Sequence, residues 1–141
     1  MAVNEIQIRA GLAAVNSGSH LRIYELDVNG GIREAQYEGK WTGGTANNVI
    51  GTGKLDTPVA ATSIALTNIR VYYVGTDNKL KESAYDSGSG WYAGALNGKN
   101  YAVAPYSSVA AVFLGGKTVL RVYAQVADNT IQGAYWRNFP L

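Results

Sequence analysis

The chain repeats one short strand-like phrase: LRIY at residues 21–24, IRVY at residues 69–72 and LRVY at residues 120–123. Each copy carries an Arg at its second position, and these three arginines are separated by 48 and 51 residues. A period of about 50 residues is typical of propellers and other repeat arrays. The repeat therefore predicts the fold class and marks equivalent positions along the chain.

Each repeat is built from short segments in the same order. A small apolar segment comes first, the Arg segment second and a segment with an acidic position third, and an aromatic, Gly-rich piece ends the first two repeats. Turn-forming residues at 29–31, 76–78 and 128–129 separate the second segment from the third, which favours hairpins. No sustained 3.6-residue period predicts a helix. Four-stranded units of this size predict an all-β β-propeller with three four-stranded blades per chain.

A single domain is predicted for residues 1–141, with repeats at about 12–58, 59–108 and 109–141. Three blades leave two apolar faces uncovered, and propellers typically have four to eight blades. Two chains would supply six blades, so we expect a six-bladed ring closed by a homodimer. Because the third repeat ends before a complete fourth strand, the alternating segment 4–11 is expected to complete that blade in the partner chain.

Composition excludes several classes of function. Only 12 basic against 10 acidic side chains give no phosphate-seeking charge, so no nucleic-acid partner is expected. No stretch approaches the roughly 18 apolar residues of a membrane span, so membrane insertion is not expected. With no Cys and one His, a metal site is not expected either. Glu5 and Arg9 lie where a signal peptide needs an apolar core, which predicts a cytoplasmic protein.

The candidate site begins with two pairs of charged residues. Glu34 follows Arg22 by twelve residues, and Glu82 follows Arg70 by the same twelve. A constant separation across a hairpin predicts that both side chains of each pair lie on one face. Fixed Arg donors beside carboxylate acceptors suit the neighbouring hydroxyls of a sugar. The alternative is an ion pair that joins adjacent strands and has only a structural role.

Aromatic residues favour the sugar over the structural interpretation. Tyr37 and Trp41 of the first repeat match Tyr85 and Trp91 of the second. A ring beside a polar fork can stack on the C–H face of a sugar while the fork binds its hydroxyls. A glycosidase needs two carboxylates about 5–10 Å apart, whereas each site proposed here holds one, so no enzyme is predicted. The remaining alternative is a propeller scaffold that binds a protein partner.

The succession IRVY, then I-x-E, then an aromatic, then GW-Y-x-GA resembles the fungal fucose-specific lectins typified by the lectin of the orange-peel mushroom Aleuria aurantia. The resemblance covers nearly the whole chain, and the stretch that begins IREAQ and continues through WTGG is similar to the fungal members. It implies a six-bladed propeller that binds L-fucose between neighbouring blades without metal or other cofactor. It also implies a multivalent lectin for fucosylated glycans and glycoproteins, with a role in defence.

The resemblance implies two sites within one chain. The first would use Arg22 and Glu34 with the aromatic wall formed by Tyr85 and Trp91. The second would use Arg70 and Glu82 with Trp136 as its wall, and Phe139 is the only candidate for its second aromatic residue.

A third site departs from the family pattern. Arg121 is present, but Gly133 occupies the acidic position. Its aromatic wall would be Tyr37 and Trp41 of the partner chain. A glycine cannot supply the hydrogen bonds that a carboxylate makes to the sugar, and each such charge-assisted bond contributes about 1.5–3 kcal/mol. This site is therefore expected to be weak or silent. A dimer would then hold four working sites.

Overall fold

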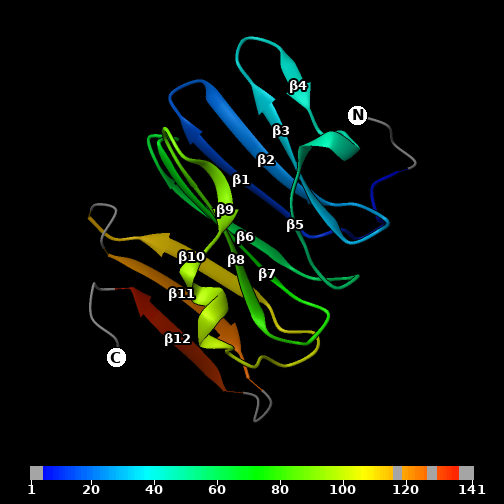
Figure 1. Ribbon diagram of the computed structural model, residues 1–141, viewed down its shortest axis with the longest axis vertical. Helices are drawn as coiled ribbons and strands as arrows, with labels where there is room; N and C mark the ends of the chain where they lie inside the picture. Colours follow the sequence, from blue (N-terminus) through cyan, green and yellow to red (C-terminus); the bar gives the residue numbers. More distant parts are fainter. Residues whose placement is uncertain (1–4, 116–118, 127–129, 137–141) are drawn as a thin grey trace.

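The computed structural model describes residues 5–115, 119–126 and 130–136. These residues form three antiparallel sheets that lie side by side, from the N-terminal sheet in blue and cyan to the C-terminal sheet in orange and red (Figure 1). The predicted all-β architecture is confirmed, and each sheet corresponds to one repeat. The expected turn at 128–129 and residues 137–141 lie outside the described residues.

The first sheet has the order β1-β2-β3-β4, with β5 also paired to β3. Two short strands share the outer edge of this sheet: β4 pairs with residues 35–37 of β3, and β5 pairs with residues 31–33 of β3. The 3-10 helix η2 (Ala46–Asn48), capped by the Thr45 side chain, joins these two edge strands. The strands are β1 (Leu12–Ser17), β2 (His20–Leu26), β3 (Gly31–Tyr37), β4 (Trp41–Gly43) and β5 (Val49–Thr52).

The second sheet repeats the order with β6-β7-β8-β9, and the third has β10-β11-β12. The 3-10 helix η3 (Ala95–Lys99) follows β9, and no α-helix occurs in the described ranges. The second sheet comprises β6 (Val59–Ile64), β7 (Asn68–Val74), β8 (Leu80–Asp86) and β9 (Gly90–Ala93). The third comprises β10 (Val109–Phe113), β11 (Leu120–Gln125) and β12 (Ile131–Trp136).

The second sheet is buried on both faces because its apolar residues alternate along the strands. On β7, Ile69, Val71 and Tyr73 pack toward the first sheet, whereas Tyr72 and Val74 pack toward the third. This two-residue period is the one that a strand requires. The first strands of successive sheets, β1, β6 and β10, are neighbours in turn. The sheets therefore stack face to face, as predicted for blades.

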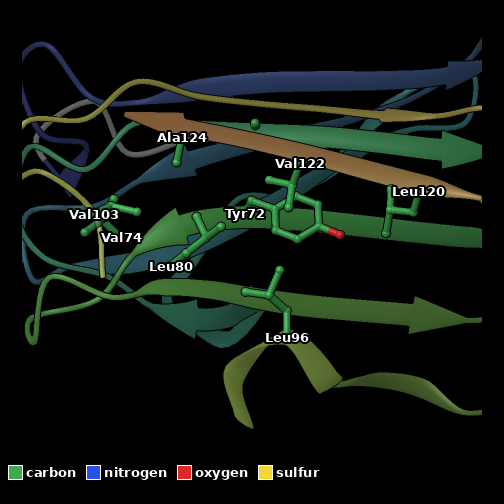
Figure 2. Packing of buried hydrophobic residues seen from close by; sticks show 9 residues of the cluster. Tyr72, Val74, Leu80, Leu96, Val103, Leu120, Val122 and Ala124 are labelled. Carbon is green, nitrogen blue, oxygen red and sulfur yellow. The ribbon is translucent and has the colours of Figure 1, made fainter. Parts of the chain in front are cut away.

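Tyr72 lies in the cluster between the second and third sheets. Figure 2 shows its ring with Leu80, Leu96 and Val122 around it, so three elements besides β7 contribute to this cluster. Tyr72 has no solvent-exposed surface. Burial of a large apolar side chain contributes roughly 1.5–3 kcal/mol, so this cluster is a main source of cohesion between the two sheets.

Tyr73 lies in the other cluster and requires a glycine beneath it. Its hydroxyl is 3.0 Å from Ser83 Oγ, which in turn donates to the carbonyl of Ile50 at 2.8 Å. A Cβ at Gly51 would overlap the Tyr73 hydroxyl, so β5 can approach the second sheet only with glycine at this position. These contacts fix the outer edge of the first sheet against the second.

The equivalent place between the second and third sheets is less well filled. In the second sheet Tyr73 pairs with Val59, and in the third sheet Ala124 pairs with the equivalent Val109. The third sheet therefore has a methyl group at the position where the second sheet has a phenol ring. A cavity of about 210 Å³ lies here. Its lining includes Leu80, Tyr101, Val103, Val122, Ala124 and Gln132.

The segment before β1 differs from the predicted strand at 4–11. Ile6 forms an isolated bridge with Asp27, and the Gln7 amide donates to the Leu26 carbonyl at 3.2 Å. Arg9 then has a φ of 62°, which ends extended pairing. Within one chain the described residues of this segment therefore form no continuous strand, and its exchange with a partner chain stays a prediction.

The two end faces of the stack differ in character. On the outer face of the first sheet, Glu25 pairs with Arg33, whose Nε donates to Asp27 Oδ2 at 2.8 Å. Glu25 is 6% exposed, and burial raises the pKa of its carboxyl group. The outer face of the third sheet instead carries apolar side chains, including Val112 and Ile131. The first sheet thus holds buried charges on its outer face, but both end faces carry exposed apolar residues, Leu12 on the first sheet and Ile131 on the third.

Candidate functional site

Arg22 and Glu34 lie on one face of the first sheet. Arg22 pairs with Gln36 across β2 and β3, and Tyr24 pairs with Glu34. Residues two apart on a strand share a face, so all four side chains are directed toward the second sheet. The sequence prediction of a shared face is confirmed.

The carboxylate of Glu34 is held by donors from two sheets. Its Oε2 accepts from the Tyr24 hydroxyl at 2.9 Å, and its Oε1 accepts from Gln36 Nε2 at 2.8 Å and from Trp91 Nε1 at 3.4 Å. Glu34 is buried, and a buried carboxylate requires such partners. Burial, followed by the nearby Glu34 charge, raises the pKa of Tyr24, so its hydroxyl remains a donor.

The predicted aromatic wall lies directly opposite this carboxylate. Tyr85 and Trp91 come from β8 and β9 of the second sheet, with ring centroids 5.5 Å apart. Trp91 also meets the Tyr24 ring edge-on, at 5.8 Å and 78°. The structure therefore brings Glu34 from one sheet together with Tyr85 and Trp91 from the next.

Arg22 forms its ion pair with a different carboxylate from the one predicted. Its Nη1 lies 2.5 Å from Glu38 Oε1 and donates to the Leu21 carbonyl at 2.8 Å. His20 Nδ1 also contacts Glu38. Hydrogen bonds from Arg22 and then His20 lower the pKa of Glu38. The ion pair of Arg22 is thus with Glu38, which the sequence analysis did not consider.

The second repeat shows the same arrangement around Arg70. Its Nη1 lies 3.1 Å from Asp86 Oδ1 and also donates to the Tyr85 carbonyl at 3.0 Å. Asp86 accepts further hydrogen bonds from Asn68 Nδ2, at 2.5 Å, and from the Tyr92 hydroxyl. Burial alone would raise the pKa of Asp86, but hydrogen bonds from Tyr92, Asn68 and Arg70 lower it to about 2. Asp86 is thus ionised at neutral pH.

This depressed pKa predicts a pH-dependent contribution to stability. Because the pKa of Asp86 is lower in the folded chain than its usual value of about 4, its stabilising effect is complete only above about pH 5. The effect is lost as the pH falls toward 2. Urea unfolding between pH 4 and pH 2 should show a steeper loss of unfolding free energy for the unmodified chain than for Asp86→Asn. Parallel curves would contradict the assignment.

Glu82 occupies the position of Glu34 in the second sheet, but its carboxylate is engaged differently. It accepts from the Tyr72 hydroxyl at 2.6 Å and from the backbone N–H groups of Ala95 and Leu96 in η3. Burial raises the pKa of Glu82, and these donors oppose the rise. A Cβ at Gly94 would overlap this carboxylate, so the contact with η3 requires glycine there.

Only part of the second predicted site is defined. Arg70 and Glu82 share a face toward the third sheet because Arg70 pairs with Ala84 while Tyr72 pairs with Glu82. The backbone of Trp136 pairs with Leu120 at the end of β12. The side chain of Trp136 and the whole of Phe139 lie outside the described residues.

The third predicted site is divided between the two ends of the stack. Arg121 and Gly133 lie on the outer face of the third sheet, whose inner face packs on the second. Tyr37 and Trp41, with ring centroids 5.3 Å apart, lie on the outer face of the first sheet. These residues are not brought together within one chain, so this site needs a second chain or further blades.

Sequence reasoning missed the residues that orient the site. Tyr24 and Tyr72 are the last letters of the repeated LRIY and IRVY phrases, and each precedes its Glu by ten residues. That constant spacing was the available signal. Glu38 and Asp86 also follow equivalent tyrosines, but their contact with the Arg side chains depends on rotamers that the spacing does not reveal.

The donor set is suited to hydroxyl groups rather than to a metal ion. Among the described residues, no group of three or more His, Cys, Asp or Glu side chains could hold a metal. In the same ranges, no helix is long and apolar enough to cross a membrane. Stacked antiparallel sheets with an Arg, a carboxylate and aromatic rings at their junction are typical of a propeller with a candidate ligand site between two blades.

The chain belongs to the fungal fucose-specific lectin family, whose sequence profile matches residues 6–139. The fucose-specific lectin of Aspergillus oryzae is 58% identical over 134 residues, which are 94% of this chain and 43% of that protein. The chain thus spans less than half the length of this curated relative. The predicted family membership is confirmed.

Solved structures show the same likeness in three dimensions. The SapL1 lectin in complex with α-methyl fucoside has a TM-score of 0.91 and 55% identity, over 96% of this chain and 45% of that one. The six-bladed β-propeller lectin of Aleuria aurantia has a TM-score of 0.83 and 36% identity, over 96% of this chain and 48% of that one. The three sheets are therefore equivalent to about half of a six-bladed propeller.

Proposed function

We propose that this chain is a non-catalytic lectin that binds the terminal L-fucose of glycans at the junctions between its sheets. The observation that carries the proposal is the Glu34 carboxylate, which is bound by Trp91 from the next sheet. Arg22 lies on the same face as this carboxylate, and Tyr85 lies beside Trp91. The fucoside complex of the SapL1 lectin supports fucose as the ligand.

Each group has a separate task in this proposal. Arg22 supplies N–H donors and Glu34 supplies acceptors for the ring and hydroxyl oxygens. Tyr85 and Trp91 receive the apolar edge and the methyl group of the sugar. Tyr24 keeps the carboxylate oriented, because its hydroxyl holds Oε2. Binding of this kind needs no metal.

We also propose that two chains close a six-bladed ring. The half-length match to the six-bladed Aleuria aurantia lectin supports this arrangement. Exposed apolar residues on the two end faces support it as well: Leu12 is 66% exposed on the first sheet and Ile131 is 75% exposed on the third. Ring closure would cover both and would align Arg121 with Tyr37 and Trp41 of the partner chain. Several sites on one rigid ring raise avidity for glycan-covered surfaces.

Calorimetric titration with L-fucose, with the mass in solution measured on the same sample, tests both proposals. We expect about two sites per chain on a particle of about twice the chain mass of 15.0 kDa, and avidity on a multivalent surface. A folded protein that gives no heat with fucose would overturn the sugar assignment. A monomer would overturn the ring while leaving the sugar assignment intact.

Removal of both arginines separates binding from structure. Arg22→Ala combined with Arg70→Ala should abolish fucose binding at both sites and leave the mass in solution unchanged. Lys81→Ala, which removes another cation from the second sheet, is the matched control and should bind as the unmodified chain does. If the double variant loses its fold instead, the arginines have a structural role. If the double variant stays folded and still binds fucose, the proposed site is wrong.

A further inference from the structure

Tyr92 lies at the rim of the second site and has no aromatic counterpart in the first. It pairs with Ala84 across β8 and β9, which places it on the same face as Arg70. In the first sheet the corresponding partner of β3 is Thr42, which pairs with Gln36. The two sites therefore differ at this position.

The Tyr92 ring is fixed although it is exposed. Its hydroxyl hydrogen-bonds to Asp86 and lies 3.5 Å from Arg70 Nη2, and the Arg70 guanidinium carbon lies 6.0 Å from the ring centroid. An exposed tyrosine would ordinarily sample several rotamers, and a ligand would have to order it. A ring that is already held loses less entropy on binding, so its exposed part is a prepared stacking surface.

Exposure increases in order along this face of the second sheet. Glu82 is 3% exposed, the Arg70 side chain 16%, the Asp86 side chain 29% and Tyr92 42%. A terminal sugar bound by Glu82 and Arg70 would fill the deep end of this series. The residue to which that sugar is attached would then extend outward, toward Asp86 and Tyr92.

We propose that Tyr92 and Asp86 form a subsite for the pyranose residue that carries the terminal fucose at the second site. The Tyr92 ring stacks on the C–H face of this second sugar, and the Asp86 carboxylate, which accepts from Arg70 and from the Tyr92 hydroxyl, holds the ring in place. The inference rests on the proposed fucose-binding function. It gives the second site a preference for fucosylated disaccharides over free fucose that the first site lacks.

The test isolates the second site in an Arg22→Ala background. Methyl α-L-fucoside is compared with the disaccharides Fucα1-6GlcNAc and Fucα1-2Gal by titration, before and after Tyr92→Thr. We expect the change to weaken binding of at least one disaccharide roughly fivefold, the size of a stacking contact, with less than a twofold effect on methyl fucoside. Equal effects on all three ligands would overturn the subsite.

Two further measurements make the result specific. Tyr92→Phe retains the ring and removes the hydroxyl, so it should keep most of the disaccharide preference. A loss of preference as large as that of Tyr92→Thr would overturn the stacking role.

Tyr92→Thr in an Arg70→Ala background, where only the first site remains, should leave the affinity for every ligand unchanged. A change of affinity there would also overturn the subsite. Failure of the unmodified chain to bind methyl fucoside would instead contradict the proposed function itself.

Discussion

Glutamine in place of Glu34 is expected to weaken fucose binding at the first site about ten- to hundredfold. The carboxylate accepts hydrogen bonds as an anion, and a charge-assisted hydrogen bond contributes about 1.5–3 kcal/mol. The amide also presents a donor where Tyr24 and Trp91 already donate, so one of these contacts is lost. Titration with methyl α-L-fucoside in an Arg70→Ala background measures this site by itself.

Glu25→Gln is the matched control for this experiment. Glu25 is a buried glutamate of the same sheet, but it lies on the opposite face. Its replacement should leave fucose affinity at the first site unchanged. Equal losses in the two variants would mean that the overall charge of the sheet, rather than the Glu34 carboxylate, governs binding. An unchanged affinity in Glu34→Gln would remove this carboxylate from the site.

Tyr72→Ala is expected to lower the unfolding free energy by about 3–5 kcal/mol, the usual cost of removing a large buried ring. Tyr72 is fully buried between the second and third sheets, and its hydroxyl is a donor to the buried Glu82. The variant therefore leaves both a void and a carboxylate short of one donor. Because native domains are stable by only about 5–15 kcal/mol, this is a large fraction of the total.

Tyr106→Ala removes the same side chain from an exposed position. Tyr106 is 84% exposed, so the expected change is within about 0.5 kcal/mol. Both variants should be unfolded with urea at one fixed protein concentration, since self-association would contribute to apparent stability. A cost below about 1 kcal/mol for Tyr72→Ala, or equal costs for the two variants, would contradict the central role of the Tyr72 cluster.

The sequence was sufficient to predict the strands and their faces because both follow from a two-residue period. The repeated LRIY-type phrase located β2, β7 and β11, and the twelve-residue spacing placed Arg22 and Glu34 on one face. The contact of Glu34 with Trp91 across two sheets was predicted through the family resemblance, since no local spacing relates residues of different sheets.

The partners of the charged groups were not predictable from spacing. The residue directly opposite Glu34 is Tyr24, whose hydroxyl reaches the carboxylate, whereas Arg22 is only a diagonal neighbour. The long Arg22 side chain extends instead to Glu38, near the strand end. Glu82 similarly meets the backbone of η3, a helix that no periodicity in the sequence indicated. Side-chain reach and loop conformation decide these contacts.

The ring that we propose joins the two end faces of the stack to each other. In that ring the outer face of the first sheet, where Leu12 is exposed, would contact the outer face of the third sheet of the partner, where Ile131 is exposed. Such head-to-tail contacts give a ring only when the rotation between subunits closes; otherwise they give an open helical fibre. A substitution that altered the angle between adjacent sheets would therefore favour an open polymer over the closed ring.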